Sequence, residues 1–190
     1  MRVLFSPPDM SECEVSLVTE ALRSGWITTG PKTKEFERKI ADYCHTEKAV
    51  CLNSATACME SILRVLGVGP GDEVITSAYT YTATASVTCH VGAKVVMVDT
   101  APNSFEMDYE QLAEAITPAT KVIIPVDLGG VMCDYERIYA AVESKRHLFT
   151  PKNSLQKAIG RVVVLADAAH AFGAQQHGKM CGEVADFTSF

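Results

Sequence analysis

Short apolar segments alternate with helix-forming segments along this chain, and this alternation limits the possible fold more than any other feature. Residues 121–126 and 162–166 are almost continuous runs of apolar residues rich in Val and Ile. Such runs are typical of strands that are covered on both faces, as in a parallel sheet. The sequence therefore predicts an α/β protein with a mostly parallel sheet.

Apolar spacing and turn residues set the expected limits of each element. Strands are expected at residues 49–52, 73–76, 94–98, 121–126 and 162–166. Helices are expected at residues 12–24, 32–44, 56–66, 80–91, 108–116 and 135–144. Ser11 and Glu14 form a capping-box pattern before the first helix, and Gly25 stands where a glycine can end it.

Composition excludes several classes of protein. The 190 residues hold 17 Lys and Arg against 23 Asp and Glu, and the resulting net charge of −6 does not favour general nucleic-acid binding. No apolar run approaches the roughly 20 residues that cross a bilayer, and the first residues lack the apolar stretch of a secretory signal. Seven cysteines without CxxC spacing fit neither a disulfide framework nor a zinc ribbon. We therefore expect a cytoplasmic protein with reduced cysteines and with no metal, nucleic-acid or membrane partner.

Residues 143–161 form an unusually basic segment between a helix and the strand that begins at Val162. A long surface connection is the plain interpretation. The alternative is a basic patch beside an anionic ligand or a partner subunit.

Three expected strands are followed by residues suited to a ligand. Residues 53–57 lead into a helix, whose free N–H groups and positive dipole end suit a phosphate, although an ordinary helix cap has the same pattern. Asp167 ends another strand, with His170 close behind, and a carboxylate there can either hold a cationic ring nitrogen or cap the next turn. Residues 77–83 supply aromatic rings for stacking on a planar ligand or for packing in the core.

Taken together, the three segments describe a planar, phosphorylated, cationic heterocycle. Pyridoxal 5'-phosphate fits this description, because its pyridine nitrogen needs an acidic partner before the ring can accept electrons. A dinucleotide fits less well, because no GxGxxG follows the first strand. A P-loop is not predicted either, because GxxxxGK[ST] is absent.

Five ordered motifs resemble the DegT/DnrJ/EryC1/StrS family of sugar aminotransferases, which are pyridoxal phosphate enzymes of the aspartate aminotransferase fold (fold type I). The motifs are residues 25–37, 52–60, 69–85, 117–130 and 166–174, and the resemblance extends from about Phe5 to Phe190. It implies a three-layer αβα large domain. Residues 1–30 would form an N-terminal arm and residues 31–190 an incomplete cofactor-binding domain, with the C-terminal small domain absent.

The resemblance assigns a role to each matching residue. Thr56 and Ala57 would bind the cofactor phosphate, with Ser54 nearby and Ser189 as a further contact. Tyr81 would stack on the pyridine ring, Asp167 would pair with its nitrogen, and His170, where many members have Gln, would lie near the ring hydroxyl. Thr28 and Thr29 would lie near the substrate.

Residues 54–57 and 117–126 most resemble the members that aminate a UDP-linked 4-keto pentose, which have Trp in place of Tyr81. The family motif SFHAxK would begin at Ser189, so the Schiff-base lysine is expected about four positions past Phe190. No lysine of the chain falls in that motif. Because that lysine moves protons during transfer, we expect this polypeptide alone to show negligible transamination.

The implied reaction moves an amino group from glutamate, which becomes 2-oxoglutarate, to a nucleotide-linked keto sugar, with a UDP-sugar favoured. The cofactor alternates between its pyridoxal and pyridoxamine forms, the product feeds polysaccharide or lipopolysaccharide synthesis, and a homodimer is implied. Two alternatives stay open. One is a sugar 3-dehydratase, which has His in place of the lysine, and the other is a truncated homologue that only binds a ligand or partner.

Overall fold

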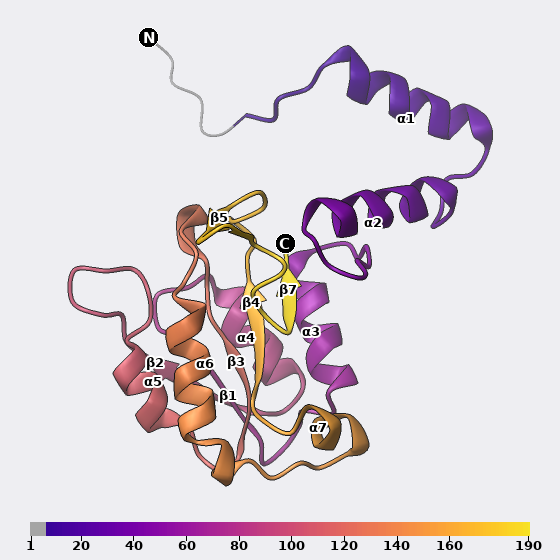
Figure 1. Ribbon diagram of the computed structural model, residues 1–190. Coiled ribbons are helices and arrows are strands. Elements are labelled where there is room, and N and C mark those ends of the chain that lie inside the picture. Colours follow the sequence, from indigo (N-terminus) through magenta and orange to yellow (C-terminus); the bar gives the residue numbers. More distant parts are fainter. Residues whose placement is uncertain (1–6) are drawn as a thin grey trace.

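The computed structural model describes residues 7–190, and its centre is a five-stranded sheet in which all paired strands run parallel (Figure 1). The strand order is β2-β1-β3-β4-β7. The strands are β1 (Glu73–Ser77), β2 (Lys94–Val98), β3 (Thr120–Ile124), β4 (Val163–Asp167) and β7 (Phe187–Ser189). A separate antiparallel hairpin joins β5 (Gln175–Gln176) to β6 (Lys179–Met180). The first six residues of the predicted arm lie outside the described residues.

The six predicted helices are all present, with ends within two residues of the expected limits. They are α1 (Glu12–Ser24), α2 (Pro31–Tyr43), α3 (Ala55–Val65), α4 (Thr82–His90), α5 (Tyr109–Ala115) and α6 (Tyr135–Ser144). The capping box of Ser11 and Glu14 is formed, and Gly25 ends α1 in the left-handed conformation. Within residues 7–190, no helix has the length and apolar character needed to cross a membrane.

Each face of the sheet is covered by its own pair of helices, which explains why the central strands are apolar at nearly every position. Helices α5 and α6 pack on one face, where the buried side chains include Leu112, Ile138, Val142, Ile75, Ile123 and Val164. Helices α3 and α4 pack on the other, where they include Met59, Leu63, Val87, Val74, Val122 and Leu165. The neighbours Val74 and Ile75 thus point to opposite cores, as alternation along a strand requires. The predicted three-layer α/β architecture is confirmed.

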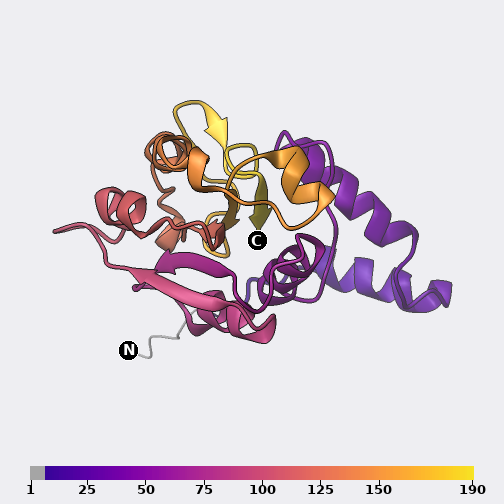
Figure 2. The same cartoon turned by 90° about the horizontal axis from the view of Figure 1, so that it is seen from below.

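Helices α1 and α2 project from this body, and the segment that joins them lies at the far end of the projection (Figures 1 and 2). Helix α1 has no buried residue, although Val15, Val18 and Leu22 share one of its faces at helical spacing. Their side chains are 55%, 60% and 64% exposed. The apolar face of α1 therefore contributes nothing to the two cores.

The predicted strand at residues 49–52 is wrong. This segment has no strand partner among the described residues, and Val50 is 72% exposed. The Cys51 N–H donates instead to the Glu37 carboxylate, at 3.0 Å. An apolar sequence forms a strand only beside another strand, and none of the described strands pairs with this segment.

The basic segment at residues 143–161 is more structured than a solvated connection. It contains the short helices η2 (Arg146–Leu148) and α7 (Ser154–Ile159), and the pattern of the sequence did not reveal either. Gln156 is buried and donates to the Leu66 carbonyl at 2.8 Å, which fixes α7 to the end of α3. Lys152 pairs with the buried carboxylate of Asp72 at 2.7 Å. Lys152 thus serves the fold itself, through its ion pair with Asp72.

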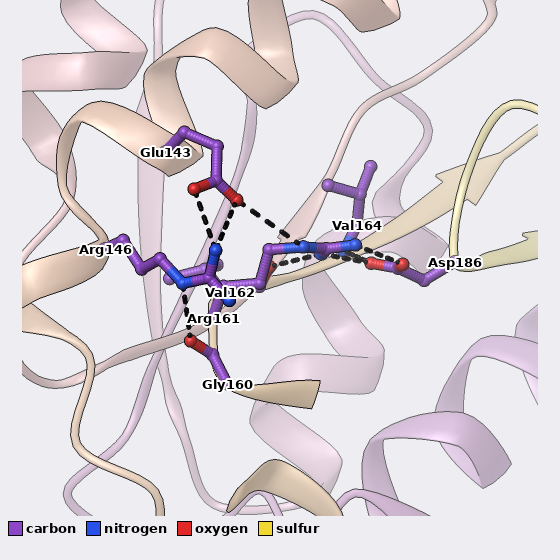
Figure 3. A network of polar contacts seen from close by, with 7 residues as sticks. All are labelled: Glu143, Arg146, Gly160, Arg161, Val162, Val164 and Asp186. Carbon is purple, nitrogen blue, oxygen red and sulfur yellow. Dashed lines mark hydrogen bonds and ion pairs between the residues drawn. The ribbon is translucent and has the colours of Figure 1, made fainter. Parts of the chain in front are cut away.

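A second part of this segment anchors β7 beside β4 (Figure 3). The Arg161 guanidinium donates two hydrogen bonds to the Asp186 carboxylate, each at 2.7 Å. Asp186 also accepts the Val164 N–H at 2.8 Å, while its own N–H donates to the Val164 carbonyl. Both side chains of the ion pair are only 20% exposed. Because Asp186 immediately precedes β7, the pair fixes where that strand begins against β4.

We predict that Asp186→Ala lowers the free energy of unfolding by about 3 kcal/mol, because it leaves the Arg161 charge and the Val164 N–H without their acceptor. Glu143→Ala is the matched control, since Glu143 is 48% exposed and lies 4.0 Å from Arg161. Its loss should cost less than about 1 kcal/mol. Urea denaturation measures both, and equal costs for the two variants would contradict the anchoring role.

Candidate active site

The carboxyl ends of the parallel strands meet at one edge of the sheet, and most of the predicted site residues lie there. Strands β1, β4 and β7 end at Ser77, Asp167 and Ser189. Asp167 is the direct register partner of Ser189. The Ala168 N–H also donates to the Ser189 carbonyl at 2.8 Å, so the pairing continues past the end of β4. In open α/β sheets this edge is where ligands bind.

Asp167 is held at this edge with one of its carboxylate oxygens engaged. Its Oδ2 accepts the hydroxyl of Thr84, from α4, at 2.6 Å. Its Oδ1 has one long contact, 3.4 Å from the Ala169 N–H. Only 6% of the residue is exposed. The second oxygen therefore keeps capacity for a strong hydrogen-bond donor.

The start of α3 lies against the end of β7. The Ser189 hydroxyl donates to the Ala55 carbonyl at 2.9 Å, which brings together residues 134 positions apart in the sequence. Ser54 caps the helix by accepting the Ala57 N–H at 3.2 Å. The N–H groups of Ala55 and Thr56 lie in the first helical turn, where no intrahelical acceptor exists. The N-terminus of α3 thus presents donors to an anion beside Ser189.

His170 follows Asp167 on an exposed turn that packs against the glycines of η1 (Leu128–Gly130). The Gly129 N–H points at His170 Nδ1, at 3.3 Å. Because a backbone N–H only donates, Nδ1 is the acceptor, and a neutral imidazole then carries its proton on Nε2. A Cβ at Gly130 would come within 3.2 Å of the His170 carbonyl, so the turn needs glycine there. His170 is therefore placed to donate from Nε2.

The other predicted residues are less closely tied to this edge. Tyr81 is the N-cap residue of α4, one turn before Thr84, and its side chain is 77% exposed. Thr28 and Thr29 lie in the exposed segment between α1 and α2, at the far end of the projection (Figure 1). Within a single chain, the structure does not bring these two threonines to the other site residues.

The sequence interpretation missed a buried carboxylate beside the site. Asp127 follows the end of β3 and is 1% exposed. Its carboxylate accepts the Cys133 N–H at 2.9 Å and the Tyr135 hydroxyl at 3.0 Å, and its own N–H donates to the Asp167 carbonyl at 3.0 Å. Asp127 thus fixes the backbone that carries Asp167. Its position directly after a buried strand, like that of Asp167, was the available signal.

Comparison with known proteins places this arrangement in a family. The model of the DegT/DnrJ/EryC1/StrS aminotransferase family matches residues 8–190. The chain belongs to this family. Among solved structures, it is similar to a putative sugar aminotransferase, Spr1654 from Streptococcus pneumoniae, in its PMP form, with 57% identity and a TM-score of 0.98. That match covers 99% of this chain and 47% of the other.

Two curated relatives of this DegT/DnrJ/EryC1/StrS chain are named for related roles. The spore coat polysaccharide biosynthesis protein SpsC of Bacillus subtilis (strain 168) is 38% identical over 98% of this chain and 44% of its own length. The UDP-4-amino-4-deoxy-L-arabinose–oxoglutarate aminotransferase of Shewanella sediminis (strain HAW-EB3) is 39% identical over 93% of this chain and 42% of its own. The chain therefore spans less than half the length of these relatives.

The predicted family and fold type are confirmed, as is pyridoxal phosphate as the cofactor of the family. The structures of the S. pneumoniae protein in its PLP (pyridoxal phosphate) and PMP (pyridoxamine phosphate) forms both match this chain with TM-scores of 0.98. Among residues 7–190, no three His, Cys, Asp or Glu side chains are grouped as a metal site requires.

The buried carboxyl of Asp127 should make the stability of the chain depend on pH. Burial raises the pKa of this carboxyl above the ordinary Asp value of 3.8. At a pH between the ordinary pKa, which applies to the unfolded chain, and the raised pKa of the folded chain, the folded chain holds more protons than the unfolded chain. The contribution of Asp127 to stability therefore falls as pH rises from the first pKa to the second. The slope is at most about 1.4 kcal/mol per pH unit for one proton.

Urea denaturation from pH 4 upward measures this effect in the wild type and in Asp127→Asn. The unfolding free energy of the wild type minus that of the variant should decrease as pH rises. Subtraction removes the contributions of the other titrating groups, and a difference that stays constant or increases with pH would refute the assignment.

Proposed function

We propose that this chain is the cofactor-binding part of a pyridoxal phosphate-dependent aminotransferase that transfers an amino group from glutamate to a nucleotide-linked keto sugar. The observation that carries the proposal is the position of Asp167, whose free carboxylate oxygen lies at the edge of the sheet that also holds Ser189 and the start of α3. This arrangement suits one ligand with a cationic ring nitrogen and an anionic group.

The chemistry of the donors fits pyridoxal phosphate. The N–H groups of Ala55 and Thr56, the Thr56 hydroxyl and the nearby residues Ser54, Ala57 and Ser189 would hold the phosphate at the N-terminus of α3. Asp167 would keep the ring nitrogen protonated by a charge-assisted hydrogen bond. His170 would donate from Nε2 to the ring hydroxyl, and Tyr81 would cover the ring face. When bound, the cofactor supplies an electron sink for the carbon that exchanges its amino group.

The named relatives support the substrate class. One relative is a polysaccharide biosynthesis protein, and another is named for a UDP-linked amino sugar and oxoglutarate. We infer a nucleotide-linked keto sugar, with a UDP-sugar favoured, and glutamate with 2-oxoglutarate as the second pair. Polysaccharide or lipopolysaccharide synthesis in the cytoplasm is the corresponding role. In this account residues 1–30 are an arm, and residues 31–190 belong to the large cofactor-binding domain.

We also propose that the chain pairs with a second copy through α1. Val15, Val18 and Leu22 line one exposed face of α1, which projects from the body. Pairing would cover this face and would bring Thr28 and Thr29 of one copy toward the substrate site of the other. Sedimentation equilibrium should show a dimer for the wild type and a monomer for Leu22→Asp, with Glu12→Gln as control. A wild-type monomer at all concentrations would contradict the pairing.

Direct binding of the cofactor tests the main proposal. Pyridoxamine phosphate binds without a covalent bond, so its affinity reports on the cradle alone. We predict saturable binding by the wild type in titration calorimetry, and about 10- to 100-fold weaker binding by Asp167→Asn, which removes the charge from the acceptor. Glu110→Gln, an exposed change on α5, is the control and should bind like the wild type. Absence of binding, or equal binding by Asp167→Asn, would contradict the proposed cofactor site.

A further inference from the structure

Behind Asp167 lies a buried hydroxyl that no assigned role explains. Thr84 is completely buried on α4, and its Oγ1 lies 2.6 Å from Asp167 Oδ2. The Oγ1 of Thr80, half-buried one turn earlier, lies 2.8 Å from Thr84 Oγ1. The contact between Thr84 and Asp167 joins residues 83 positions apart, so it links the α4 layer to the end of β4.

Counting protons gives these contacts a direction. A threonine hydroxyl has one proton to donate, and an ionised carboxylate only accepts. Thr84 therefore donates to Asp167, and its own oxygen accepts the proton of Thr80. The chain of donation runs from Thr80 to Thr84 to Asp167, with every proton placed.

The direction of donation fixes which oxygen of Asp167 is available. Oδ2 faces α4 and is occupied by Thr84, whereas Oδ1 has, within residues 7–190, only the 3.4 Å contact with the Ala169 N–H. Thr84 is also the third residue of α4, so the carboxylate lies beside the first turn of that helix.

We propose that Thr84 is a positioning residue: its hydroxyl, oriented by Thr80, turns Asp167 so that Oδ1 faces the protonated nitrogen of a pyridine ring. This inference rests on the proposed function. Thr84 itself touches no ligand, so its effect passes entirely through the bond between Asp167 and the ring nitrogen. It follows that the effect disappears for a ligand without that nitrogen.

The test compares two ligands on the full chain: pyridoxamine phosphate and its 1-deaza analogue, in which a C–H replaces the ring nitrogen. Thr84→Val keeps the shape of the side chain and removes the hydroxyl. We expect it to weaken pyridoxamine phosphate binding about tenfold, because a carboxylate that is no longer oriented makes a poorer charge-assisted hydrogen bond to the ring nitrogen. The affinity for the deaza analogue should change by less than about twofold, because that ligand gains nothing from an oriented carboxylate.

Two further variants separate positioning from a general structural effect. Thr84→Ser keeps the hydroxyl and should restore most of the affinity for pyridoxamine phosphate. Thr88→Val is the matched control on the same helix, since Thr88 is equally buried and its hydroxyl has no partner in the described chain. It should bind both ligands like the wild type. In an Asp167→Asn background, Thr84→Val should cause no further loss.

The outcomes are distinct. Equal losses for both ligands in Thr84→Val would show that the residue only supports the local fold, and unchanged affinity for pyridoxamine phosphate would show that Asp167 needs no positioning. Either result overturns the inference while leaving the proposed cofactor site intact. Failure of the wild type to bind pyridoxamine phosphate would overturn the proposed function and this inference with it.

Discussion

The parallel pairing of β4 with β7 is the interaction on which the rest of the site depends. It sets Asp167 directly opposite Ser189, and Ser189 in turn bonds to the first residue of α3. A carboxylate for a cation and a helix N-terminus for an anion therefore lie on neighbouring elements. At the other end of β7, the ion pair of Arg161 and Asp186 fixes where the strand begins. An error of one residue in this register would turn Ser189 away from α3.

Individual contacts, and not the net charge of the chain, determine where an anion could bind. The chain as a whole carries a net charge of −6, so it has no overall positive charge to attract a phosphate. Several basic side chains of residues 143–161 are paired within the fold, as Lys152 is with Asp72 and Arg161 with Asp186. An anion would instead be bound by backbone N–H groups and hydroxyls at the start of α3, which require no net positive charge. Asp167 is also held by a local contact, because the hydroxyl of Thr84 on α4 donates to its carboxylate.

Much of the fold could be predicted because each pattern had one physical meaning. Apolar runs covered on both faces indicated β3 and β4, and helical spacing with caps indicated α1 and α6 to the residue. The strand predicted at residues 49–52 failed because pairing is a property of neighbours and not of the segment itself. Helix α7 was missed because six residues carry too little periodicity, and its buried Gln156 looks polar in sequence.

The candidate site also contains residues that local sequence signals predict and residues that only the structure reveals. Asp167 and the start of α3 were predictable, because a carboxylate after a buried strand and small residues before a helix are local signals. Asp127 carried the same local signal, because it directly follows the apolar run at residues 121–126, but the sequence interpretation did not use it. Thr84 was not predictable, since its importance lies in a contact with a segment distant in the sequence. A threonine in a helix that holds other threonines has no pattern that marks it as a donor to a carboxylate 83 positions away.

A crystal structure of the chain with pyridoxamine phosphate tests the central claim most directly. The account predicts the phosphate at the N-terminus of α3, beside Ser189, and the ring nitrogen about 2.8 Å from Asp167 Oδ1, with Thr84 still bonded to Oδ2. Density for the ligand elsewhere, or a ring nitrogen that faces away from Asp167, would contradict it.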